Sequence, residues 1–171
     1  MARSSEASLY ALETAERTGE PSLYDRDVYT WSSQQAGLIR AGRLTEVDWE
    51  NVAEEIDSLG RSERSSLQSF LALVIQHMLK WDYQPEKRTR SWIVSMNTHR
   101  AHVRRRLRLS PGLKAQLPDL VEEAYGFAVD LVEAETGIPT DDLPTRSPYG
   151  VAEILEREFS VSDLGGAEGG R

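Results

Sequence analysis

Apolar residues recur at intervals of three and four along most of this chain, and this periodicity restricts the possible folds more than any other feature. It returns in successive segments between residues 25 and 159, and no segment shows the strict alternation of a half-buried strand. Such intervals place apolar side chains along one side of an α-helix, where they can dock against a core. The sequence therefore predicts an all-α fold, a compact bundle of about six helices.

Capping and turn-forming residues divide the periodic region into separate helices. The second predicted helix begins near Asp48 and ends at Gly60, and its apolar face carries Trp49, Val52, Ala53, Ile56 and Leu59. The third, from Ser62 to about Trp81, is apolar on more than one side, so we expect it to be the central helix. The other predicted helices are Asp25 to Gly42, Thr89 to Leu109, Pro118 to Gly137, and a short one from Pro148 to about Phe159.

Composition predicts how the chain is organised into domains. Residues 1–23 are polar and small, and residues 160–171 are rich in glycine, so we expect a flexible N-terminal arm and a flexible tail. The 171-residue length suits one core, which predicts a single helical domain over residues 24–159.

The absence of cysteine excludes several classes of site. Disulfides, thiolate metal sites and thiol catalysis all require a residue that this chain lacks. The longest unbroken apolar run, Phe70 to Ile75, is too short to cross a bilayer, and the first ten residues contain no apolar targeting segment. We therefore expect a soluble cytoplasmic protein with no membrane association.

Charge is distributed unevenly along the chain. The formal net charge is −8, yet Lys80 to Lys114 contains ten basic residues against two acids, a net +8, and the remainder has ten basic against twenty-six acidic residues, a net −16. Such separation predicts a basic surface on an otherwise acidic protein.

Two sequence blocks together resemble one known family. The first is the stretch from Asp48 to Glu63, and the second contains His77, Lys80, Trp81, Tyr83, Gln84, Pro85, Arg88, Arg90, Ser91 and Trp92. In order and spacing they resemble the bacterial family known as domain of unknown function twenty-nine, over roughly Tyr24 to Phe159. The resemblance implies an all-helical fold and a bacterial context, but no activity, ligand or catalytic residue.

Histidines and carboxylates raise the question of a metal site. His77, His99 and His102 are the only histidines, and Glu54, Glu55 or Asp57 could join them as ligands. However, the chain contains no Glu-x-x-His pair, and His99 and His102 depart from the family pattern. We therefore predict no bound metal and no cofactor.

His77 and the acidic helix also suggest acid–base chemistry. With Glu54, Glu55 or Asp57 as its partner, His77 could serve a small hydrolase or nuclease, with or without Mg²⁺. The structural alternative is a buried histidine bonded to one of these carboxylates, with the remaining acids pairing with the basic helix. We favour the structural alternative, because such pairs are ordinary interior contacts.

The strongest candidate for binding is the basic helix. Arg100, Arg104 and Arg108 follow one another at four-residue steps, and Arg88 and Arg90 lie beside aromatic residues upstream. In the Gln84-Pro85 turn, we expect Tyr83 and Gln84 to be exposed, whereas Trp81 and Trp92 belong in the core.

Together these residues favour a non-enzymatic interaction module that binds an acidic protein or nucleic acid through the basic helix. The alternatives are the hydrolase or nuclease described above and a regulatory or antitoxin-like protein-pairing module.

Overall fold

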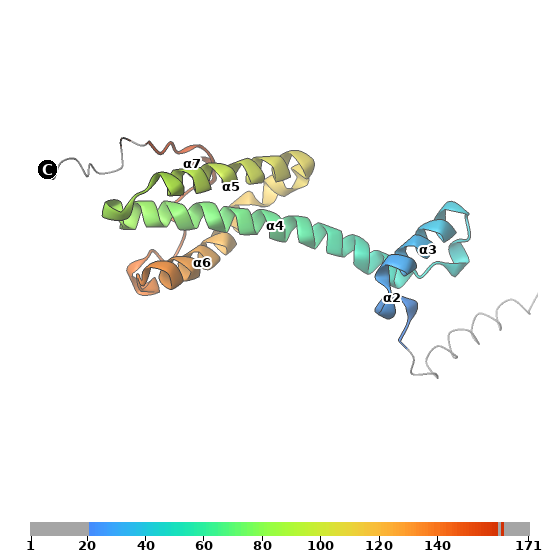
Figure 1. Cartoon of the computed structure of the whole chain (residues 1–171). Helices are drawn as coiled ribbons and strands as arrows, with labels where there is room; N and C mark the ends of the chain where they lie inside the picture. The colour runs from blue at the N-terminus through green and yellow to red at the C-terminus, as the bar shows by residue number, and fades with distance from the viewer. Residues whose placement is uncertain (1–20, 161, 163–171) are drawn as a thin grey trace, which may run out of the picture. The chain divides into compact units, whose positions relative to one another are not determined.

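The computed structural model describes residues 21–160 and residue 162, which form six α-helices joined by turns and short 3-10 helices (Figure 1). No strand occurs among these residues. The predicted all-α fold of about six helices is therefore confirmed. Most of the predicted N-terminal arm and C-terminal tail lies outside the described residues.

The α-helices differ widely in length. The longest, α4, has 35 residues, whereas α2 has only four. Their bounds are α2 Leu23–Arg26, α3 Val28–Arg40, α4 Trp49–Tyr83, α5 Arg90–Leu109, α6 Leu117–Thr136 and α7 Val151–Glu156.

Contacts along the chain separate into two compact units, and the boundary lies between Ser58 and Leu59, inside α4. The first unit contains α2, α3 and the start of α4. The second contains the rest of α4 together with α5, α6 and α7. The predicted domain over residues 24–159 includes parts of both.

The first unit is organised around Asp48, which precedes α4. The carboxylate of Asp48 accepts a hydrogen bond from Trp31 Nε1 at 3.2 Å, and its backbone N–H donates to Gln35 Oε1 at 2.9 Å. Trp31 and Gln35 are one turn apart on α3, and both are buried. Asp48 therefore links the start of α4 to the buried side of α3.

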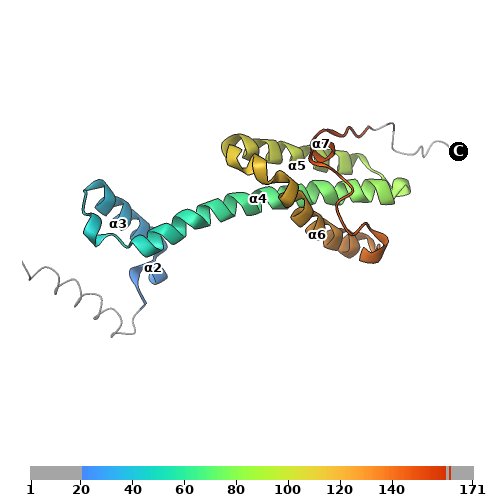
Figure 2. The same ribbon diagram turned by 180° about the vertical axis from the view of Figure 1, so that it is seen from behind.

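The second unit contains the larger core. Figures 1 and 2 show α5 running along one side of the C-terminal part of α4, with α6 on the other side. Ion pairs reinforce both contacts, Glu63 of α4 with Arg106 of α5, and Arg64 of α4 with Glu123 of α6. The fully buried apolar side chains of this core include Leu67, Leu71, Val74, Ile75, Met78, Leu79, Met96, Val103, Leu120, Ala124, Val132 and Ile154.

The predicted break at Gly60 is wrong, because α4 continues through it. A helix-interior glycine costs only about 1 kcal/mol relative to alanine, so neighbouring turns can carry the helix past it. The backbone φ of Gly60 is not positive, whereas Gly42 and Gly137 have φ of 71° and 74°. These two glycines follow α3 and α6 as predicted, in the left-handed conformation that favours glycine.

The helix predicted from Asp25 to Gly42 is also corrected, because it is divided in two. Asp25 belongs to α2, where it forms a capping box with Ser22, and Asp27 caps α3 by accepting a hydrogen bond from the Thr30 N–H at 3.0 Å. Val28, the first residue of α3, is exposed. The predicted helices over α5 and α6 agree with the structure to within a residue at each end, and α7 is shorter than predicted.

None of the helices among the described residues combines the length and the apolar character that a membrane span requires.

Candidate functional site

His77 and the three candidate carboxylates occupy opposite ends of one helix. Glu54, Glu55 and Asp57 lie in the first three turns of α4, and His77 lies in its last two turns. An α-helix rises 1.5 Å per residue, so the twenty residues from Asp57 to His77 span about 30 Å. The arrangement required by the hydrolase or nuclease hypothesis, His77 within hydrogen-bond reach of these carboxylates, is not formed.

His77, Glu55 and Glu63 each have hydrogen-bond partners other than one another. His77 is half-buried, and its Nδ1 donates a hydrogen bond to the carbonyl oxygen of Leu73 at 2.8 Å. Glu55 accepts a hydrogen bond from the hydroxyl of Tyr24 at 2.7 Å. The expected pairing of the acidic helix with the basic helix involves a different carboxylate, because Glu63 is the residue that binds Arg106.

The three histidines lie near one another between α4 and α5. The ring centroids of His77 and His99 are 6.4 Å apart, those of His99 and His102 are 6.5 Å apart, and His102 stacks on Phe70 at 4.6 Å. Burial lowers the pKa of His77, and burial together with the other two histidines lowers the pKa of His99. Among the described residues, no group of histidines and carboxylates has an arrangement that could hold a metal ion.

The basic helix α5 carries six arginines and no acid, and the structure divides these arginines between two roles. Arg100, Arg104 and Arg106 bind groups within the second unit. Arg90, Arg105 and Arg108 are exposed and form no ion pair with any described residue. Arg104 is also exposed, but Arg100 is buried, so the predicted ridge of Arg100, Arg104 and Arg108 does not face solvent as one surface.

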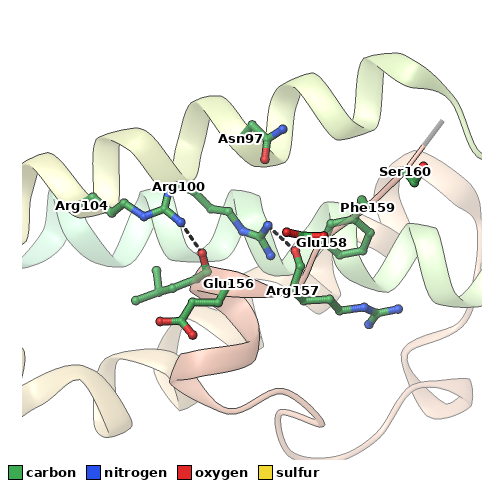
Figure 3. Close-up of a pocket in the computed structure, with 9 residues that line it drawn as sticks. Asn97, Arg100, Arg104, Glu156, Arg157, Glu158, Phe159 and Ser160 are labelled. Carbon is green, nitrogen blue, oxygen red and sulfur yellow. Dashed lines mark hydrogen bonds between the residues drawn. The ribbon is translucent and has the colours of Figure 1, made fainter.

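Arg100 differs most from its predicted place on the surface, because it is only 3% exposed. Its guanidinium donates to the backbone oxygens of Ile154 at 2.6 Å, Arg157 at 2.6 Å and Glu153 at 3.3 Å. These carbonyls belong to the C-terminal end of α7, where helix carbonyls lack partners within the helix. Arg104 donates to the neighbouring Leu155 oxygen at 2.5 Å, so two arginines of α5 cap α7 (Figure 3).

The turn between α4 and α5 is only partly as predicted. Tyr83 is exposed, as expected, but Gln84 is only 6% exposed, so that prediction is wrong. The Gln84 backbone N–H donates to Lys80 O at 2.9 Å, so Gln84 stays joined to the last turn of α4. Trp81 is buried as predicted, and Arg88 lies over its ring at 4.9 Å while donating to its backbone oxygen at 2.9 Å.

A polar cluster that sequence reasoning missed joins the end of α4 to the C-terminal segment. Both carboxylate oxygens of Asp82 accept hydrogen bonds from Arg157, at 2.8 and 2.6 Å, and one also accepts from the Tyr149 hydroxyl at 2.8 Å. Burial opposes ionisation of Asp82, but the hydrogen bonds from Arg157 and Tyr149 outweigh it, so its pKa is lowered. The sequence offered one indication of this cluster, because Asp82 is one of only two acids in the basic stretch from Lys80 to Lys114.

Aromatic contacts complete the attachment of the C-terminal segment. Phe159 meets Trp81 edge to face at 5.3 Å, and the guanidinium groups of Arg100 and Arg157 lie over its ring at 5.2 and 4.9 Å. Trp81, which belongs to the block that resembles the known family, therefore contacts the C-terminal segment through Phe159.

One protein family matches this chain. The model of the family described as Domain of unknown function DUF29 matches residues 23–160. No curated protein matches the chain, and no solved structure matches it either. Because the match covers well over half of the sequence, the chain belongs to the DUF29 family.

Proposed function

We propose that this protein is a non-enzymatic interaction module that binds an acidic surface of a partner protein through the outer face of α5. The α5 outer face is defined by Arg90, Arg105 and Arg108. The observation that carries the proposal concerns the six arginines of a helix that has no acid. Arg90, Arg105 and Arg108 are exposed and form no ion pair with any described residue, while the other three bind within the second unit.

The neighbours of these arginines favour a protein over a nucleic acid. At 100° per residue, Val94 and Leu109 fall on the same side of α5 as Arg90, Arg105 and Arg108, and they are 56% and 62% exposed. Arginine beside exposed apolar side chains is typical of protein interfaces. The net charge of −8 disfavours non-specific binding to nucleic acid.

Binding to two kinds of labelled probe tests the proposal. Fluorescence anisotropy would compare a Glu- and Leu-containing helical peptide with single- and double-stranded DNA, at roughly 50 and 200 mM salt. We expect the peptide to bind and to lose about tenfold in affinity at the higher salt, because charge attraction is screened. Tighter binding of DNA would assign the face to nucleic acid, and failure to bind the peptide at low salt would overturn the proposal.

A pair of charge-matched variants locates the surface. Replacing Arg90, Arg105 and Arg108 with Ser should weaken peptide binding by about tenfold or more. Replacing Arg26, Arg40 and Arg146 with Ser removes the same charge from other exposed positions and should change affinity by less than about twofold. Equal losses in the two variants would show that net charge, and not the α5 outer face, determines binding.

A further inference from the structure

The side of α5 that meets α7 borders a pocket. Its volume is about 580 Å³, within the usual range for small-molecule sites. Figure 3 shows Arg100 and Arg104 on the α5 side, with the end of α7 and Phe159 opposite. Polar groups and one aromatic ring therefore line a space large enough for a small molecule.

The positive charge of Arg100 is buried without a carboxylate. Its hydrogen bonds go to three backbone carbonyls, and it forms no ion pair with any described residue. Carbonyl dipoles only partly replace a negative charge, and a buried cation ordinarily has an anionic partner. Burial, together with nearby Arg104 and Arg157, lowers the pKa of Arg100 to about 10. This wall of the pocket therefore lacks negative charge.

Hydrogen-bond donors remain available on the same wall. A guanidinium has five N–H groups, of which Arg100 uses three and Arg104 uses one in bonds to backbone oxygens. The exposed Asn97, one turn before Arg100, adds a side-chain amide at the pocket edge.

The other charged residues at the pocket do not cancel the two arginines. Figure 3 shows the Glu156 carboxylate pointing away from Arg100 and Arg104. Arg157 contributes its backbone here, because its guanidinium binds Asp82. Glu158 is exposed, and it is one carboxylate beside two guanidinium groups.

We propose that this pocket binds a small phosphorylated molecule, with Arg100 and Arg104 holding the phosphate group and Phe159 lying against its apolar part. Arginine matches phosphate in charge and in fork-shaped donor geometry. Arg90, Arg105 and Arg108 do not line this pocket, so the site uses other side chains than the proposed protein interface. The ligand would contact α5 and the α7 segment together and hold them in place.

Calorimetric titration of the full chain tests this site, with pyrophosphate and inorganic phosphate as probes and citrate as a carboxylate comparison at equal ionic strength. We expect pyrophosphate to bind most tightly, because it offers the most oxygens to the two arginines. No heat of binding with either phosphate would overturn the proposal, and tighter binding of citrate would overturn the assignment to phosphate.

Two neighbouring arginines provide matched variants. Arg104→Gln should weaken pyrophosphate binding by about tenfold or more, whereas Arg105→Gln removes the same charge outside the pocket and should change it by less than about twofold. Glu158→Gln should strengthen binding, because it removes the opposing charge. An unchanged far-ultraviolet circular dichroism spectrum would show that Arg104→Gln still folds. Equal weakening in the two arginine variants would overturn the site.

The two proposals can fail separately. The variant lacking Arg90, Arg105 and Arg108 should keep its pyrophosphate affinity while losing peptide binding. Arg104→Gln should lose pyrophosphate affinity while keeping peptide binding.

Discussion

The two ends of α4 carry apolar residues at similar helical spacing, but only one end buries them. Near its start, Trp49, Ile56 and Leu59 are 51%, 62% and 69% exposed. Towards its end, Leu71 and Ile75 are at most 1% exposed, because they lie in the core formed with residues of α5 and α6. An apolar stripe identifies the side of a helix that can dock, but burial requires another element to cover that side. The predicted docking face of Ile56 and Leu59 is therefore largely uncovered by the described residues.

The largest effect is expected when the same substitution, isoleucine to alanine, is made near each end of α4. Ile75→Ala should lower the free energy of unfolding by about 2–5 kcal/mol, because it opens a cavity in a packed core. Ile56→Ala should change it by less than about 0.5 kcal/mol, because the side chain is already exposed. Urea unfolding of the full chain measures both. Similar losses in the two variants would show that Ile56 is covered in solution.

A second test concerns the polar cluster at the end of α4. Asp82→Asn should lower the free energy of unfolding by roughly 1–3 kcal/mol, because it weakens charged hydrogen bonds to half-buried Arg157 and buried Tyr149. Asp130→Asn makes the same change at an exposed site of α6 and should have little effect. Thermal and urea unfolding would compare them. If the two variants were equally stable, the cluster would not anchor the C-terminal segment.

Two glycine substitutions extend the comparison, one at Gly60 near the boundary between the units and one at Gly137 after α6. Gly60→Ala should raise the free energy of unfolding by roughly 0.5–1 kcal/mol, because Gly60 is helical and nothing obstructs an added methyl group. Gly137→Ala should have the opposite sign and lower it by about 1 kcal/mol, because a φ of 74° disfavours side chains with a β-carbon. A loss of stability in Gly60→Ala would argue against a continuous α4.

The smallest effect is expected in the pH dependence of the second unit. The pKa values of His77 and His99 are lowered in the folded protein, so the unfolded chain binds more protons as pH falls from about 7 to about 5. The free energy of unfolding should therefore decrease over this range. Replacing both histidines with Gln should flatten this decrease in urea unfolding at the two pH values. An unchanged slope would assign the pH dependence to other groups.

Several parts of the fold could be predicted from local sequence. The apolar spacing located the helices, and Pro111-Gly112 and Gly137 marked the ends of α5 and α6, because proline and glycine act on the backbone at their own positions. The same reasoning misplaced an end at Gly60. A glycine permits a helix to stop but does not force it to, since the turns on either side can still form hydrogen bonds.

The candidate site was less predictable. The spacing of Arg100, Arg104 and Arg108 correctly placed them on one helix, but it could not show that α7, about fifty residues later, would bury Arg100 and accept a hydrogen bond from Arg104. Glu54, Glu55 and Asp57 suggested partners for His77 only while α4 was predicted as two helices that could fold back on each other. Once α4 is one helix, those contacts are lost.

The sequence by itself determined the helical class, most helix boundaries, the separation of charge and the family, because these depend on local backbone preferences and on residue order. Tertiary structure decided that Arg100 is buried, which carboxylates pair with other arginines and which apolar stripe is covered. Those outcomes depend on contacts between residues far apart in the chain. The free energy of a charged side chain is set by the groups that surround it after folding, not by its neighbours in sequence.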